Sequence, residues 1–318
     1  MVRRRTAWGT AVSTGVLGVL LLVPGCGGSP QTSHAPEPVA TPTPSAMAEL
    51  RLPLDAYLPT PEEQATSEYL VYRAQQHCMH TFGYRYLPHL SADHIGIVVA
   101  TRREYDSRRY GVSEMGIAAQ RGYHLSPRSP GSRTPQPATA LPVREREVLS
   151  GRGPDGRKLT SPVGGKAVPD GGCAGQGERT VHIGALDAVQ RGYDLVTRLR
   201  RQMFERSRSD PRVAAVNRKW SACMRDKGLG YRDPDAAIDD DQWDLESAGP
   251  SRAEIVVATS DIACKLRTNL LGVNFAVEAE YENTVIREHA RELRAVRAHG
   301  DAEAERFPGL MRRYDRAP

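Results

Sequence analysis

The chain has 318 residues, enough to bury the core of one or two domains, and only 6% of them are aromatic. Its formal charge is +5, but the first 25 residues contain three arginines and no acidic residue, so the remainder sets 40 of the 43 Lys and Arg residues against 38 Asp and Glu residues. This near balance lacks the basic excess with which nucleic-acid-binding proteins neutralise phosphates, and we expect no nucleic-acid partner.

Residues 1–26 have the pattern of a bacterial lipoprotein signal peptide. Three consecutive arginines precede an apolar run that is too short to be a good membrane span. The run ends in Val23-Pro24-Gly25-Cys26, which resembles a lipobox although Pro24 departs from the usual motif. We therefore predict a signal peptide at 1–25, a lipid on Cys26 and attachment to the extracytoplasmic face of the cell membrane. Secretion without a lipid is the alternative.

A proline-rich stretch follows the signal. Between 26 and 60, several prolines lie among Ser, Thr and Ala, a composition that favours an extended, solvated chain over a packed one. We predict a tether at 26–60 that lifts the folded part away from the membrane.

The folded part is expected to be mainly helical. Pro61 begins an amphipathic run with two glutamates in its first turn, and Asp210-Pro211 has the pattern of a helix cap followed by proline at the first helical position. Ser251 and Glu254 have the spacing of a capping box. Helices are predicted at 61–80, at 113–123 with Ser113 as the cap, at 144–149, at 187–209, from 211 to a stop at 227, from 251, and at 270–298.

Three segments depart from this helical pattern. The apolar, β-branched run at 95–100 favours a short strand. The stretch at 126–172 is rich in proline and glycine and is predicted to be a long loop. The charged residues at 301–318 are predicted to form a frayed tail. The expected fold is thus a mainly α, bundle-like domain at 61–300.

Two stretches share one arrangement, HCMHTFGYRY at 77–86 and WSACMRDKGLGY at 220–231. Each places Cys-Met at the end of an amphipathic run and then a glycine followed by Tyr-Arg. One more cysteine follows each copy, Cys173 after the first and Cys264 after the second. The domain is therefore expected to contain two similar submodules, at 61–183 and 184–300.

These motifs belong to a longer series of residues in a fixed order, spread over about 70–270. With this series the chain resembles a family of uncharacterised secreted proteins and lipoproteins of actinobacteria. The resemblance implies export and two disulfide bonds, and it carries no known activity. The matching residues are Cys78-Met79, Phe82-Gly83, Arg109-Tyr110-Gly111-Val112, Ala119, Gly122-Tyr123, Leu149, Gly151, Gly171-Gly172-Cys173, Trp220, Cys223-Met224, Asp261 and Cys264.

Five cysteines leave an even number for pairing once Cys26 carries a lipid. An exported compartment lets the resulting disulfides persist. The remaining four cysteines allow three connectivities. We predict Cys78–Cys173 and Cys223–Cys264, because each bond joins a Cys-Met copy to the lone cysteine that follows it.

Two groups of residues could in principle ligate a metal ion, but each is better explained without one. The histidines at 77, 80, 89 and 94 lie near Cys78 and Met79 and could suit copper or zinc, but Cys78 cannot both ligate and pair, and the spacing matches no standard zinc signature. The acidic run at 233–246 lacks the spacing of a calcium-binding EF-hand and favours a solvated loop. We predict no metal or other cofactor.

No standard catalytic motif is present: the sequence contains no GxSxG, HExxH, SxxK or P-loop pattern. We therefore predict no catalytic residues and a non-enzymatic cell-envelope binding or interaction module, with a cell-envelope protein as the candidate partner. One alternative is an envelope hydrolase with its site near the 126–172 loop. The other is a metal-handling lipoprotein that uses His77, His80, His89 and His94.

Overall fold

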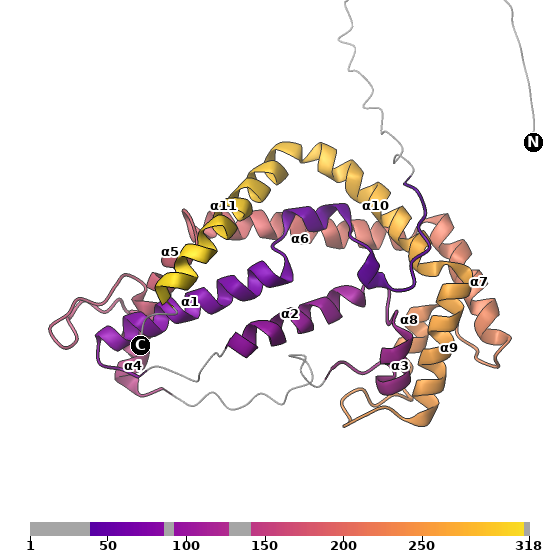
Figure 1. Cartoon of the computed structure of the whole chain (residues 1–318), viewed down its shortest axis with the longest axis horizontal. Helices are drawn as coiled ribbons and strands as arrows, with labels where there is room; N and C mark the ends of the chain where they lie inside the picture. Colours follow the sequence, from indigo (N-terminus) through magenta and orange to yellow (C-terminus); the bar gives the residue numbers. More distant parts are fainter. Residues whose placement is uncertain (1–38, 86–91, 127–140, 315–318) are drawn as a thin grey trace, which may run out of the picture. The chain divides into compact units, whose positions relative to one another are not determined.

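The computed structural model describes residues 39–85, 92–126 and 141–314 (Figure 1). The described part is mainly helical, as predicted, and its β structure is confined to isolated bridges. Over the same residues, no helix combines the length and the hydropathy needed to cross a membrane. The elements are η1 (Met47–Glu49), η2 (Pro53–Tyr57), α1 (Pro61–Thr81), α2 (Ala92–Ser107), α3 (Met115–Arg121), α4 (Val143–Ser150), α5 (Gly172–Val181), α6 (Leu186–Arg208), α7 (Pro211–Arg225), α8 (Pro234–Ile238), α9 (Arg252–Thr268), α10 (Leu270–Glu288) and α11 (Ala290–Tyr314).

The helix starts follow the local signals in the sequence. Thr60 and Glu63 form a reciprocal capping box at the start of α1, with N···O distances of 3.1 and 2.8 Å. The Asp210 carboxylate accepts from the backbone N–H of Arg212 at 2.8 Å, and the Ser251 hydroxyl accepts from that of Glu254 at 3.1 Å. These contacts satisfy backbone donors that have no partner within the helix.

The strand predicted at 95–100 is wrong, because these residues lie inside α2. Their β-branched side chains are half-buried, and α2 packs against α1 and η1. The intrinsic preference of β-branched residues for strands is weak and context-dependent, so tertiary packing overrides it here. The helix expected at 113–123 is shorter, Met115–Arg121, and Ser113 is not its cap. Instead the Ser113 hydroxyl accepts from the backbone N–H of Met47 at 3.1 Å.

The charged tail is not frayed over its described part. The helix predicted at 270–298 breaks at His289, and the next helix, α11, runs on to Tyr314. Phe307 and Tyr314 are buried against Leu70 of α1, and the backbone carbonyl of Tyr314 accepts from the Arg73 guanidinium at 2.7 Å. Apolar residues spaced by three or four positions among the charges supply this packed face.

The predicted tether is also wrong for residues 39–58, which we call the strap. Met47, Leu52 and Leu54 of the strap are buried, because apolar residues begin just beyond its proline-rich part. The strap approaches the α9–α10 junction so closely that a Cβ at Gly272 would lie 1.9 Å from the Pro42 carbonyl oxygen. Only glycine allows that approach.

Both disulfides form as predicted, and each lies in its own core. Cys78 and Cys173 have Cα atoms 5.5 Å apart, and Cys223 and Cys264 have Cα atoms 5.7 Å apart. The division into submodules at 183 does not follow the packing, however. Tyr110, Val112, Ala118 and Tyr123 belong to the core of the second disulfide, and α3 packs on α9.

Candidate functional site

The structure separates most of the residues that sequence reasoning singled out. Cys26, the predicted lipid site, lies outside the described residues. His77 and His80 are exposed on α1, and the His77 ring lies edge-on to Tyr314 with centroids 6.0 Å apart. His89 and the His94 side chain also lie outside the described part. Among the side chains that the structure does describe, no three His, Cys, Asp or Glu residues are grouped to hold a metal ion.

The acidic run at 233–246 is used locally. The Asp233 carboxylate caps α8 by accepting from the Ala236 N–H at 2.8 Å. Asp240 accepts from the Tyr231 hydroxyl at 2.7 Å, and Asp235 pairs with Arg208. These contacts account for several of the carboxylates without a cation.

The loop proposed for a hydrolase site is described, apart from residue 126, only from 141 onward. It contains α4, close to the predicted 144–149, and the start of α5, which sequence reasoning missed. An ion pair between Lys158 and Asp170, at 2.7 Å, ties this part together. The protein has a pocket at the turn between α6 and α7 and another beneath the strap, and the described part of the loop lines neither of them.

A buried polar network occupies the core beside the second disulfide. The Trp220 indole N–H donates to the Asp261 carboxylate at 3.0 Å, and that carboxylate pairs with Lys265 at 2.9 Å. Lys265 also donates to the Val112 carbonyl at 2.8 Å. Burial raises the pKa of Asp261, and the Lys265 ammonium opposes that rise. All these side chains lie in the interior, so the network holds α7, α9 and the 110–113 segment together.

A second buried group links α10 to the segment before α3. The Arg109 guanidinium pairs with Glu278, with Nε 2.9 Å from Oε1, and the Tyr110 hydroxyl donates to the same carboxylate at 2.7 Å. Several residues that the sequence analysis singled out therefore have architectural contacts: Arg109, Tyr110, Trp220, Asp261 and Cys264.

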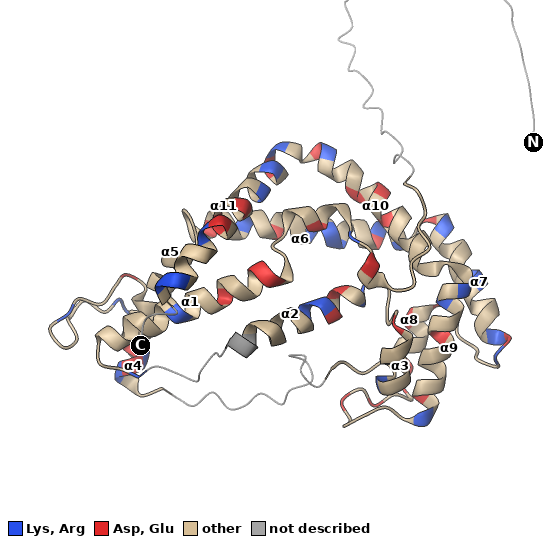
Figure 2. Cartoon of the chain, viewed as in Figure 1, with Lys and Arg blue, Asp and Glu red and all other residues tan. Residues whose placement is uncertain are grey.

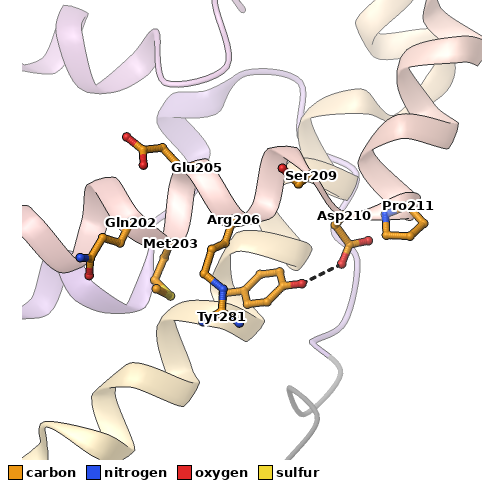
Figure 3. A pocket seen from close by; sticks show the side chains of 8 residues that line it. All are labelled: Gln202, Met203, Glu205, Arg206, Ser209, Asp210, Pro211 and Tyr281. Carbon is orange, nitrogen blue, oxygen red and sulfur yellow. Dashed lines mark hydrogen bonds between the residues drawn. The ribbon is translucent and has the colours of Figure 1, made fainter.

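A wide pocket lies at the turn between α6 and α7, where Tyr281 of α10 approaches it. We call it the elbow pocket; its volume is about 650 Å³ and it is open to solvent. Figure 3 shows the Arg206 side chain lying against the Tyr281 ring, with the Tyr281 hydroxyl directed at Asp210. The lining residues are Gln202, Met203, Glu205, Arg206, Ser209, Asp210, Pro211 and Tyr281.

The elbow pocket is held by a chain of polar contacts. The Arg206 guanidinium carbon lies 5.0 Å from the centroid of the Tyr281 ring, within the range of a cation–π contact. The Tyr281 hydroxyl donates to Asp210 at 3.3 Å. Arg212 pairs with Asp210 at 3.0 Å and with Glu280 at 2.7 Å. The hydrogen bond from Arg212 lowers the pKa of Asp210, so this wall carries an ionised carboxylate that is already paired.

The part of α6 that leads into the elbow pocket is basic, whereas the lining itself has two acidic residues, Glu205 and Asp210, and one arginine, Arg206. Residues 198–208 of α6 contain five arginines and a single acidic residue, Glu205. Two of the arginines form ion pairs, whereas Arg198, Arg201 and Arg206 are exposed and form none with the described residues. Figure 2 shows basic segments where α6 approaches α7.

The lining residues set the chemistry that the elbow pocket offers. The lining contains one hydroxyl side chain outside Tyr281, that of the exposed Ser209, and no histidine that could act as its base. The Arg206 guanidinium, by contrast, lies 5.0 Å from the centroid of the Tyr281 ring and keeps donors for a bidentate contact with a carboxylate. Sequence reasoning found the Asp210-Pro211 turn but missed the contact between Arg206 and Tyr281, because no local pattern links residues so far apart.

Comparison with protein-family models, with curated proteins and with solved structures finds no match to this chain.

Proposed function

We propose that this protein is a lipid-anchored extracytoplasmic binding module whose contact surface is the elbow pocket. The pattern of residues 1–26 supports export and lipidation at Cys26. The two disulfide bonds support an oxidising compartment, because such bonds are rare in reducing ones. The resemblance to uncharacterised secreted proteins and lipoproteins of actinobacteria agrees with this placement.

The observation that carries the binding role is the combination of side chains at the elbow pocket. Arginine and tyrosine are enriched at protein interfaces, and Arg206 and Tyr281 meet there at an open hollow. The excess of arginine along 198–208 selects a partner of opposite charge. The partner is therefore a cell-envelope protein with an acidic segment, and a carboxylate of that segment pairs with Arg206.

Site-specific photo-cross-linking on intact cells tests this function. A photoreactive amino acid replaces Gln202, which lines the pocket, or Gln190, which is exposed on the same helix outside it. We expect capture of one envelope protein from position 202 and not from position 190, with the linked peptide rich in Asp and Glu. Equal capture from both positions, or a basic linked peptide, contradicts the proposed contact surface.

The anchoring claim has its own test. A Cys26→Ala variant should leave the membrane fraction, while the wild-type protein should remain in it and carry the mass of a diacyl group on Cys26. A variant that stays membrane-bound to the wild-type extent refutes lipid anchoring and leaves the binding surface untouched.

A further inference from the structure

A second pocket lies beneath the strap, where the strap faces α2 and α6. Its volume is about 270 Å³. We call it the strap pocket. Six charged residues line it, and the arginines outnumber the aspartates by four to two: Arg51, Asp55, Arg103, Asp106, Arg109 and Arg200.

The partners of these arginines leave donors unused. Arg109 is neutralised by Glu278, and Arg200 pairs with Asp55 at 2.8 Å through a terminal nitrogen. The Nε atom of Arg200, however, is buried and has no hydrogen-bond partner among the described residues. Arg51 forms no hydrogen bond or ion pair with any described residue, and it is exposed at the mouth of the pocket.

The Nε atom of Arg200 is a buried donor without a hydrogen-bond partner among the described residues, and it belongs to a residue that lines a pocket rich in arginine. A ligand in the strap pocket that supplies an acceptor would explain this donor. Buried polar atoms are nearly always hydrogen-bonded, and each one without a partner costs free energy. A carboxylate offers two oxygens in one plane, whereas a phosphate offers several oxygens in three dimensions. Arginines that line the pocket from three separate elements, Arg51 on the strap, Arg103 on α2 and Arg200 on α6, match the phosphate better.

We propose that the strap pocket binds a phosphate group, held by Arg51, Arg103 and Arg200. Arg103 also forms an exposed ion pair with Glu62, and its remaining guanidinium donors serve the phosphate. Bound phosphate joins the strap to α2 and α6, and so it stabilises the strap against opening. Asp106 also lines the pocket, and its negative charge opposes a bound anion. The phosphate comes either from a free phosphate compound or from the headgroup of a membrane lipid.

Hydrogen exchange and titration of the detergent-solubilised full-length protein test the proposal. Inorganic phosphate is expected to bind saturably, to raise the melting temperature and to slow amide exchange at 47–55. Acetate at equal ionic strength is expected to have none of these three effects. Arg51→Gln should weaken phosphate binding about tenfold, since charge-assisted hydrogen bonds are among the stronger ones. Arg51 is exposed and makes no contact that folding requires, so this variant should fold normally.

The control variant is Arg191→Gln, which removes an exposed arginine from the other end of α6. It should bind phosphate like the wild type. The proposal is overturned if phosphate does not bind saturably, or if Arg51→Gln and Arg191→Gln bind it equally well.

A reconstituted sample distinguishes the two sources of phosphate. In phosphate-free buffer, the protein is placed in vesicles of phosphatidylcholine alone or with phosphatidylglycerol. Slow exchange at 47–55 only with phosphatidylglycerol, lost in Arg51→Gln, identifies a lipid headgroup as the ligand. Protection that needs added inorganic phosphate in both vesicles identifies a free compound. Either result supports the phosphate site.

Discussion

Replacing Glu282 with glutamine should remove much of the pH dependence of stability. Glu282 is completely buried on α10, and one of its oxygens accepts from the backbone N–H of Leu54 in the strap at 2.8 Å. The other oxygen has no hydrogen-bond partner among the described residues. Burial raises the pKa of Glu282 to about 8; the Leu54 N–H lowers it in part, and the charge of Glu278, four residues earlier, raises it further.

The magnitude follows from proton linkage. The unfolded chain releases the Glu282 proton near pH 4.5, whereas the folded protein holds it to about pH 8. Between these values the folded state binds the extra proton, so raising the pH destabilises it. From pH 5 to pH 8 the loss in unfolding free energy is about 3 kcal/mol, at roughly 1.4 kcal/mol per pH unit. Glu282→Gln keeps an acceptor for Leu54 and cannot ionise, so it avoids this loss.

The assay is chemical denaturation followed by circular dichroism at pH 5 and at pH 8. Glu282→Gln should be about 3 kcal/mol more stable than the wild type at pH 8, equivalent to about 5–10 °C in melting temperature, and close to it at pH 5. Glu288→Gln, an exposed change at the end of the same helix, is the control and should follow the wild type. If Glu282→Gln loses as much stability as the wild type between pH 5 and pH 8, Glu282 is not the source of this pH dependence.

Two further predictions concern the cores and the ends of the domain. Trp220→Ala should cost ~3–5 kcal/mol in denaturant unfolding, because it empties a fully buried site and removes a donor to Asp261; an unchanged midpoint would show that the second disulfide core does not depend on this ring. The pKa of His182 is raised to about 9 by hydrogen bonds to Glu178 and Glu303. The stabilisation from protonated His182 is thus complete below pH 6.5 and is lost as the pH rises through 9. His182→Ala should therefore lower the melting temperature at pH 6 more than at pH 10; equal losses at both would contradict a charged His182.

Local signals in the sequence were sufficient to locate many helix ends. Asp210-Pro211 and Ser251 carry their own capping groups, and a cap depends on neighbours a few residues away. The disulfide pairs were also predictable, because each Cys-Met copy is followed by a single cysteine. These features depend on order along the chain, which the sequence displays directly.

The remaining features depend on long-range packing. The residues next to Leu54 in the sequence do not indicate that its backbone N–H will donate to Glu282. The many charged residues around Phe307 make it difficult to recognise from sequence the apolar face that packs on α1. The candidate site was hidden for the same reason. In the sequence, nothing distinguishes Arg206 from the other arginines of its helix, because its contact with Tyr281 depends on the packing of α10.

The central claim, that the elbow pocket receives an acidic partner, is tested most directly by charge reversal during cross-linking from position 202 on intact cells. Arg206→Glu changes the guanidinium at the pocket, and Arg191→Glu makes the same change at an exposed site on the same helix. We expect Arg206→Glu to abolish the cross-linked product and Arg191→Glu to preserve it. A product of equal yield in both variants would show that no acidic partner pairs with Arg206.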